Sequence, residues 1–394
     1  MTELPKLHIA VLMGGWANER PVSLMSGEGI AKALEERGHR VTRIDMDRQV
    51  AARIAEAAPD VVFNALHGVP GEDGTVQGML DLMGVPYTHS GLATSVIAID
   101  KQLTKQALVP QGIPMPGGRI VRSADLHERD PLPRPYVLKP VNEGSSVGVA
   151  IVTDDGDYGN PIARTAKGPW QDFPQLLAEP FIKGREMTSA VVDFADGPRA
   201  LAVTELKPKS GFYDFDAKYT DGRTDHMCPA DIPQAITDLC LEYALKAHRV
   251  LGCKGTSRTD FRWDEEQGED GLFILETNTQ PGMTPLSLVP EQARFAGIEY
   301  GELCELIVAA ALRDHAGTAG NRSQKAHAAR KHTSGLLDRV MAALPFSEEQ
   351  WHRFFLTVIV AAGLGIAWTI ASFAGVPELA RTELAKSASR SGFE

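Results

Sequence analysis

The 394-residue sequence has little cysteine and no excess of basic charge. Its cysteines are too few for a disulfide scaffold, and none stands at zinc-finger spacing from His or another Cys, so we expect buried free thiols in a reducing cytosol. They are Cys228, Cys240, Cys253 and Cys304. The 40 Lys and Arg face 51 Asp and Glu, a formal net charge of −11, which argues against nucleic acid as the main partner. At 43% hydrophobic residues, the chain is not disordered over its whole length.

Two common nucleotide signatures are also missing. The turn at Gly14-Gly15 lacks the GxGxxG pattern, so no dinucleotide cofactor is expected. The loop at 142–148 (NEGSSVG) does not match GxxxxGK[ST], so it is not a P-loop. No secretory signal peptide is expected, because residues 1–6 lead directly into an apolar strand at 7–13.

The charge divides the chain into two unlike parts. Residues 319–394 hold nine Lys or Arg and six Asp or Glu, a net charge of +3, which leaves −14 for the first 318. The length alone suggests two or three domains.

The first part reads as an α/β protein. Apolar strands at 7–13, 41–45 and 60–66 alternate with helical patterns, as in a parallel sheet covered by helices. Further strands follow, and the fold class expected is α/β, with α+β in the C-terminal lobe. They are expected at 135–140, 176–181, 188–194, 200–206, 257–264 and 272–277, with helices at 232–251 and 300–313 and an irregular segment at 209–229.

The second part contains a candidate membrane span. Residues 314–335 read as a flexible basic linker, and the 21 residues Phe354–Ala374 carry no charge. At about 1.5 Å per residue they would cross the roughly 30 Å hydrocarbon core. A buried core helix is the alternative. Basic residues before the span would place the large part in the cytoplasm.

Polar residues follow several of the predicted strands. Glu19, near the carboxyl edge of the first sheet, could pair with an amine. Lys139 ends a strand beside the Gly/Ser-rich loop and suits nucleotide phosphates. A solvated acid and an ordinary turn are the alternatives. The loop 67–74 (HGVPGEDG) is a further candidate, with a plain hairpin-like loop as its alternative.

The most specific pattern lies on the last two strands. Glu276 and Asn278 are two residues apart and therefore share a face, and Arg258 and Asp260 share a face of the neighbouring strand. Three oxygen ligands, Asp260, Glu276 and Asn278, suit Mg²⁺. A solvated acidic strand end is the alternative.

Taken together and in order, these motifs resemble the D-alanine–D-alanine ligases of the ATP-grasp superfamily. The resemblance covers about residues 7–313. It rests on GGWANERPVSLMSG, ALHGVPGEDGTVQGMLDLMGVPYTHSG, KPVNEGSSVG, FYDFDAKY, LGCKG and LETNTQPGMTPLSLVP.

The resemblance implies a three-domain ATP-grasp ligase followed by a tail. The expected parts are an N-terminal α/β substrate domain (1–100), a central lobe (101–184), a C-terminal lobe with the metal site (185–313), a basic linker (314–353), a transmembrane helix (354–375) and a short extracytoplasmic tail (376–394).

It also implies an activity, namely ATP-dependent joining of two D-alanine molecules through an acyl phosphate, for peptidoglycan precursor synthesis. ATP and two Mg²⁺, or Mn²⁺ in their place, would be required. The alternatives are a D-alanine–D-lactate or D-alanine–D-serine ligase, and a membrane-bound division scaffold with an inactive or passenger ligase domain.

Residue roles carry over from the family motifs. Glu19 would hold the ammonium of the first D-alanine with His67 nearby, and Glu19, Ser145 and Tyr219 would fasten the loop 209–229 over the site. Arg258 and the Gly282 N–H would stabilise the tetrahedral oxyanion.

The remaining implied roles concern ATP, metal and the second substrate. Lys101 and Lys139 would contact ATP phosphates, and Lys218 the transferred phosphate. The others are Glu179 and Glu186 at the nucleoside, Asp260, Glu276 and Asn278 at two Mg²⁺, and Ser287 with the Leu288 N–H at the second carboxylate.

Some positions depart from the family pattern. The segment 256–260 (TSRTD) replaces a more usual aromatic-Gly-Arg-Ile/Val-Asp, and Gln280 stands where Ser or Asn is common. Arg258 and Asp260 are retained, so activity is expected. Tyr219 favours D-alanine as second substrate.

The tail does not resemble the ligase family. Its linker, apolar span and residues 376–394 resemble in organisation the start of the bitopic cell-division protein FtsQ. A natural fusion, a joined pair of neighbouring genes and a truncated record all fit the sequence. A membrane contact through Phe354–Ala374, a division-complex contact through the tail and a homodimer are the expected partners besides D-alanine.

Overall fold

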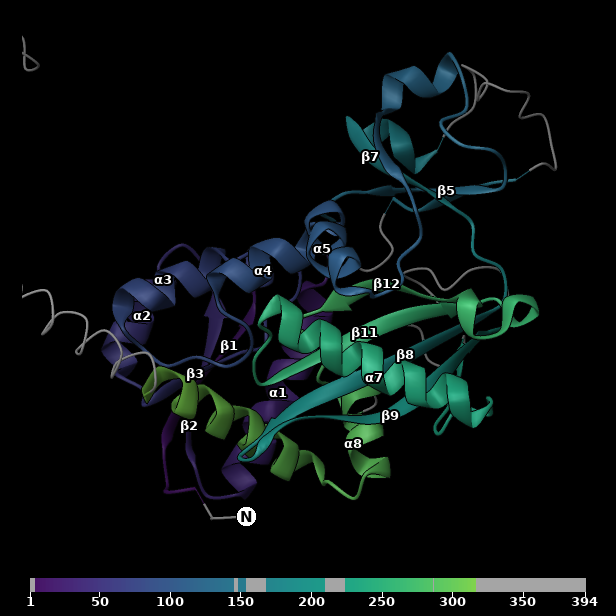
Figure 1. The fold of residues 1–394 in the computed structure, drawn as a ribbon. Helices are drawn as coiled ribbons and strands as arrows, with labels where there is room; N and C mark the ends of the chain where they lie inside the picture. The colour runs from purple at the N-terminus through teal and green to yellow at the C-terminus, as the bar shows by residue number, and fades with distance from the viewer. Residues whose placement is uncertain (1–3, 145–147, 154–167, 210–223, 286, 317–394) are drawn as a thin grey trace, which may run out of the picture. The chain divides into compact units, whose positions relative to one another are not determined.

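The computed structural model describes residues 4–144, 148–153, 168–209, 224–285 and 287–316 (Figure 1). By its internal contacts the chain divides into two units, Met1–Gly317 and Thr318–Glu394, and every described residue belongs to the first. The predicted linker begins at residue 314, but residues 314–316 form the end of a helix. The rest of the linker, the membrane span and the tail, at 317–394, lie outside the described residues. Within the described part, no helix combines the length and apolarity that crossing a membrane requires.

The first sheet is parallel, as predicted. Its strands are β1 (His8–Gly14), β2 (Arg40–Met46) and β3 (Val61–Asn64), in the order β2-β1-β3. Alternate residues of β1 pack on opposite layers: Ile9 contributes to the core that includes α1 (Arg20–Glu36), and Leu12 to the core that includes α2 (Val50–Ala57) and α3 (Thr75–Met83). Burial on both faces explains the continuous apolar run of β1.

The second sheet is antiparallel and follows two short helices. Helices α4 (Leu92–Ile99) and α5 (Lys101–Leu108) are separated by Asp100, whose side chain caps α5 by accepting from the Gln102 and Leu103 N–H groups. The strands are β4 (Arg119–Arg122), β5 (Tyr136–Pro140), β6 (Ala150–Val152) and β7 (Gln175–Pro180), in the order β4-β7-β5-β6.

The third sheet has five antiparallel strands in the order β10-β9-β8-β11-β12. They are β8 (Arg185–Phe194), β9 (Gly197–Pro208), β10 (Thr224–Met227), β11 (Thr256–Trp263) and β12 (Leu272–Asn278). Helix α7 (Gln234–Leu251) packs on one face, and α8 (Leu288–Phe295) with the helix at 300–316 on the other (Figure 1).

One secondary-structure prediction was wrong. The segment 209–229 was expected to be irregular, but its described end forms β10, which pairs with β9 from Thr224–Pro208 to Met227–Glu205. The strand is short and polar, so it carries no apolar alternation. Short 3₁₀ helices complete the described chain at Val109–Gln111, Ser123–His127, Pro169–Asp172 and Glu265–Gly271. The predicted domain boundaries at 100, 184 and 313 stay predictions.

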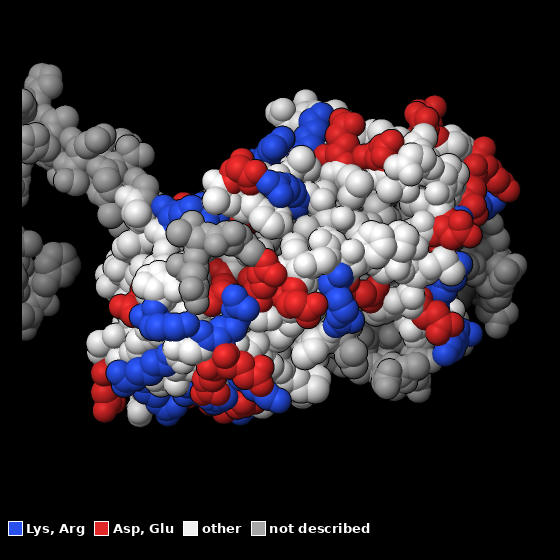
Figure 2. Space-filling model, turned by 90° about the horizontal axis from the view of Figure 1, so that it is seen from below, with Lys and Arg blue, Asp and Glu red and all other residues white. Residues whose placement is uncertain are grey.

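Positive and negative side chains are interspersed on the face shown in Figure 2. Among the exposed pairs of α1 and β2, Arg43 binds Glu35 at 2.6 Å and Glu28 at 3.0 Å. Such exposed pairs contribute about 0–1 kcal/mol each.

His89 is an unusual buried residue. It is 4% exposed, has a φ of 70°, and neither ring nitrogen has a hydrogen-bond partner among the described residues. Burial, with a smaller contribution from the charge of His67, lowers its pKa to about 3. The native protein therefore holds this ring neutral over the range in which an unfolded histidine, with a pKa of about 6.5, becomes protonated.

This predicts a loss of stability in acid. As the pH falls below about 6.5, this histidine binds a proton in the unfolded state but not in the native state. His89 therefore lowers the free energy of unfolding by up to about 1.4 kcal/mol per pH unit, until its native pKa is reached. His89→Asn, which tolerates positive φ, should flatten the pH profile of urea unfolding. The half-buried His315→Asn is the control. An equally steep profile in His89→Asn would contradict the assignment.

Candidate active site

The turn after β1 is fixed against the end of β3. The Gly14 N–H donates to Ser23 Oγ at 2.8 Å, and that hydroxyl donates to the Ala65 carbonyl at 2.7 Å. Gly14 has a φ of 82°, and a Cβ there would lie 2.1 Å from Asp45 Oδ1, so only glycine fits. The turn places the start of α1 at the carboxyl edge of the first sheet.

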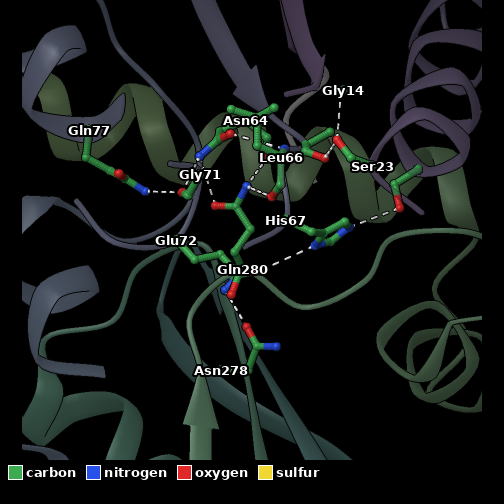
Figure 3. Close-up of polar contacts among 12 residues, drawn as sticks. Gly14, Ser23, Asn64, Leu66, His67, Gly71, Glu72, Gln77, Asn278 and Gln280 are labelled. Carbon is green, nitrogen blue, oxygen red and sulfur yellow. Dashed lines mark hydrogen bonds and ion pairs between the residues drawn. The ribbon is translucent and has the colours of Figure 1, made fainter. Parts of the chain in front are cut away.

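Two predicted substrate residues lie at this edge. Glu19 is 7% exposed, and its Oε2 approaches Gly68 so closely that a Cβ at Gly68 would lie 2.8 Å away. His67 is buried, with Nε2 3.3 Å from Ser26 Oγ and Nδ1 3.4 Å from Glu72 Oε1 (Figure 3). The Glu19 carboxylate thus lies against Gly68, the residue that follows His67, at the edge where the sequence predicted an amine site.

A pocket lies between the second and third sheets. It has a volume of about 790 Å³ including its open mouth, within the usual range for small-molecule sites. Its lining includes five of the predicted site residues besides Asp260. They are Lys101, Lys139, Glu179, Glu186 and Glu276.

A buried charge cluster includes two residues of the pocket lining, Glu179 and Lys139. Glu179, 2% exposed, binds Lys139 Nζ at 2.6 Å and also Lys105 Nζ, which donates in addition to the Pro116 carbonyl. Burial acts to raise the pKa of Glu179, but the two lysines outweigh it and lower the pKa. Two cations share one anion, so this cluster carries a net positive charge beside the pocket. The role of Lys105 was missed because nothing near it in sequence indicates its partner.

Two further pocket residues are held by neighbours. Lys101 Nζ donates to the Glu143 carbonyl at 2.6 Å and lies 3.8 Å from Glu276 Oε2. Burial, together with the charge of Glu19, raises the pKa of Glu143. Glu186 Oε2 accepts from Arg262 Nη1 at 3.0 Å.

The candidate metal residues lie on paired strands. In the ladder of β11 and β12, Arg258 is opposite Asn278 and Asp260 is opposite Glu276, so all four are on one face. Arg258 holds Asp260 through two bonds of 2.8 and 2.7 Å, and Thr188 Oγ1 donates to the same carboxylate at 2.6 Å.

The oxygen donors on this face fit Mg²⁺. Two carboxylates and one amide are the hard ligands it prefers, with water and phosphate oxygens completing six. Among the described residues, no group of three or more His, Cys, Asp or Glu could hold a metal ion.

The predicted second-substrate residues lie at the start of α8. Ser287 precedes the helix, and its Oγ is 2.7 Å from Thr284 Oγ1 and accepts from the Thr284 N–H at 3.1 Å. Leu288 is the first helical residue, so its N–H points out of the helix start. A Cβ at Gly282 would lie 3.1 Å from Ser287 Oγ. Ser145, Lys218 and Tyr219 lie outside the described residues.

Comparison with known proteins defines first the class and then the family. The chain resembles the crystal structure of a D-alanine–D-alanine ligase from Bacillus anthracis complexed with ATP, with a TM-score of 0.63, 26% identity, and coverage of 79% of this chain and 99% of that one. The described part thus has the α/β fold of the ATP-grasp ligases.

Sequence comparison is more specific. The family models "D-ala D-ala ligase C-terminus" and "D-ala D-ala ligase N-terminus" match residues 119–309 and 48–90. The chain is 79% identical over 315 residues to the D-alanine–D-alanine ligase of Erythrobacter litoralis, covering 80% of this chain and 96% of that protein. It is 75% identical over 311 residues to the D-alanine–D-alanine ligase of Novosphingobium aromaticivorans, covering 79% of this chain and 98% of that protein. The chain belongs to the D-alanine–D-alanine ligase family.

Proposed function

We infer that this protein joins two D-alanine molecules to D-alanyl-D-alanine with ATP, for peptidoglycan precursor synthesis. The observation that carries this is 79% identity to a D-alanine–D-alanine ligase over nearly that enzyme's whole length. It favours ligation over an inactive passenger domain, because the charged residues of the proposed site are retained.

The reaction has two steps. An oxygen of the first D-alanine carboxylate attacks the γ-phosphorus of ATP, the bond to ADP breaks, and an acyl phosphate forms. The free amine of the second D-alanine then attacks the carbonyl carbon, the amine loses a proton, and inorganic phosphate leaves. Activation is needed because a carboxylate is a poor acyl donor.

The described residues supply binding and charge for both steps. Glu19 with His67 binds the first ammonium, while Lys101 and Lys139 bind ATP phosphates. Arg258 donates to the oxyanion of the second step, where a donor is typically worth about 10²–10³ in rate.

Other residues complete the assignment. The Gly282 N–H is the second oxyanion donor, and Ser287 with the Leu288 N–H binds the second carboxylate. Glu179 and Glu186 contact the nucleoside. Lys218 at the transferred phosphate, and the link of Glu19 with Ser145 and Tyr219, keep the roles that the family resemblance gives them.

Asp260, Glu276 and Asn278 hold two Mg²⁺ in this proposal, with Mn²⁺ as a substitute. Ions held by these residues would supply neutralisation of the phosphate charge during transfer. Their proposed placement rests on the ladder of β11 and β12 and on the oxygen donors that it gathers.

The test is phosphate release by the purified chain with ATP, Mg²⁺ and D-alanine. We expect release that depends on D-alanine, with L-alanine, D-lactate and D-serine as comparison acceptors. Faster release with D-lactate or D-serine would replace the acceptor assignment. If a folded chain that binds ATP releases no phosphate, the ligase function is overturned and the membrane-bound division scaffold is favoured.

We further propose that Phe354–Ala374 tethers a cytoplasmic catalytic part to the inner membrane. The support is a 21-residue uncharged segment preceded by basic residues. Fractionation tests it: recovery of the full chain in the soluble fraction without detergent would refute the span. Binding of the tail to division proteins, as its resemblance to FtsQ suggests, would be tested by pull-down from detergent extracts.

A homodimer is proposed on different grounds. Helices α3 to α5 and the 3₁₀ helix that follows them carry exposed apolar side chains, and such side chains mark an interface where they form one contiguous patch. They are Leu82, Leu92, Val96, Leu103 and Val109. Light scattering of the chain without its tail residues, compared with a Leu82→Lys variant, would measure it.

A further inference from the structure

A buried cluster of amides joins the first sheet to the end of β12 (Figure 3). The Gln280 side chain, 2% exposed, makes three hydrogen bonds there. Its Nε2 donates to the Asn64 carbonyl at 2.9 Å and to the Leu66 carbonyl at 2.8 Å, and its Oε1 accepts from Asn64 Nδ2 at 3.0 Å. Both amide hydrogens are therefore used, and the two carbonyls fix which end of the amide faces them.

Asn64 is fully engaged in return. Its Nδ2 also donates to the Gly71 carbonyl at 3.1 Å, and its Oδ1 accepts from the Leu66 N–H at 3.2 Å. Gln77 Nε2 donates to the same Gly71 carbonyl at 2.6 Å. The cluster thus fixes the backbone of the loop that follows β3 at several points.

Each end of the cluster leads to a proposed substrate or metal residue. On one side, the Leu66 carbonyl belongs to the peptide that precedes His67. On the other, the Gln280 N–H donates to Asn278 Oδ1 at 2.8 Å. This bond orients the amide that would face the metal, leaving the second lone pair of its oxygen available.

We propose that Gln280 is a positioning residue that holds the first-substrate loop and the metal-binding end of β12 in one fixed arrangement. The inference rests on the proposed function, because the first D-alanine must present its ammonium to the loop and its carboxylate to the phosphate and metal. Gln280 acts through His67 and Asn278 and does not touch the reacting atoms.

The experiment compares Gln280→Ala and Gln280→Ser with the control Gln77→Ala. All three remove a buried amide from the cluster, but Gln77 has no contact with β12 in the described hydrogen bonds. Serine is small and polar and is too short to reach Asn64. It provides a second variant if the alanine variant does not fold. Thermal unfolding shows which variants are folded.

The decisive measurement is the affinity for Mn²⁺ in the presence of ADP, determined by electron paramagnetic resonance, because it requires no turnover. Both Gln280 variants keep the backbone N–H that holds Asn278 Oδ1 but lose the side-chain bonds that fix that backbone against Asn64 and Leu66. The Mn²⁺ dissociation constant and the KM for D-alanine should therefore each rise by about tenfold, the lower end of the effect of disturbing an outer ligand partner. Gln77→Ala should lower the melting temperature and leave the Mn²⁺ dissociation constant unchanged.

A double-mutant cycle tests the side-chain bond between the two amides. Asn64→Ala removes the bond from Asn64 Nδ2 to Gln280 Oε1 and leaves the two bonds from Gln280 Nε2 to backbone carbonyls, so it should weaken Mn²⁺ binding less than Gln280→Ala. The effects of the two substitutions should be less than additive, because both remove that one bond. Wild-type Mn²⁺ affinity in folded Gln280 variants would overturn the proposal. A loss of Mn²⁺ affinity in Gln77→Ala as large as the loss in the Gln280 variants would also overturn it. If the wild type binds Mn²⁺ with this pattern but releases no phosphate, the ligase function fails and the positioning role stands.

Discussion

Replacing Arg258 with alanine is expected to reduce D-alanine-dependent phosphate release by at least about 10²–10³-fold. The guanidinium is the proposed oxyanion donor, and it also holds Asp260 through two bonds of 2.8 and 2.7 Å. Its removal therefore takes away a charge-assisted donor and releases a carboxylate placed next to the proposed metal. Arg258→Lys should recover little, because an ammonium cannot reproduce the planar fork.

Phosphate release at saturating ATP and D-alanine measures this effect. Arg122→Ala is a matched control, because Arg122 also forms a two-bond pair with a carboxylate, Asp125, but is exposed. Glu276→Ala should be as damaging as Arg258→Ala. Turnover within tenfold of the wild type in either site variant would remove that residue from the proposed site.

Glu179→Ala is expected to lower the free energy of unfolding by about 3–5 kcal/mol, the usual effect of removing one partner from a buried ion pair. The substitution leaves Lys105 and Lys139 facing each other without their shared anion. Desolvation already lowers the pKa of Lys105 in the native protein. Without the carboxylate, the burial of Lys105 is no longer offset by an opposite charge, which favours its neutral form or its movement toward solvent.

Urea unfolding at pH 7, followed by fluorescence and circular dichroism together, measures the change. The control is Glu265→Ala, whose half-exposed carboxylate binds Arg185 at 3.3 Å and should contribute no more than about 1 kcal/mol. A Glu179→Ala protein as stable as this control would show that the three charges are solvated rather than interdependent.

The sequence allowed much of the fold to be predicted wherever burial leaves a pattern. Strand β1, buried on both faces, produces an unbroken apolar run, and the first parallel sheet follows from it. The edge strands β4 and β10 were not predicted because four mostly exposed residues leave no alternation to detect. Helix α7 was predicted to within two residues because its apolar positions recur at helical spacing.

Some residues of the candidate site could be predicted from the sequence and others could not. Residues at strand ends, such as Asp260 and Glu276, could be placed on one face because alternation along neighbouring strands is local. The partners of Glu179 and Gln280 could not be predicted, because they come from elements distant in sequence. The sequence around an amide or a lysine does not indicate which distant carbonyl or carboxylate it will contact.

The hydrogen bond between Asn64 and Gln280 spans 216 residues of sequence. At a synthesis rate of about 5–20 residues per second, the ribosome needs about 10–40 s to make the second partner after the first. During that interval the nascent chain exposes the carbonyls after β3 without the amide that later covers them. The substrate loop is therefore among the last parts of the catalytic unit to be completed, and a nascent chain stalled before residue 280 should be open to proteases at residues 64–71.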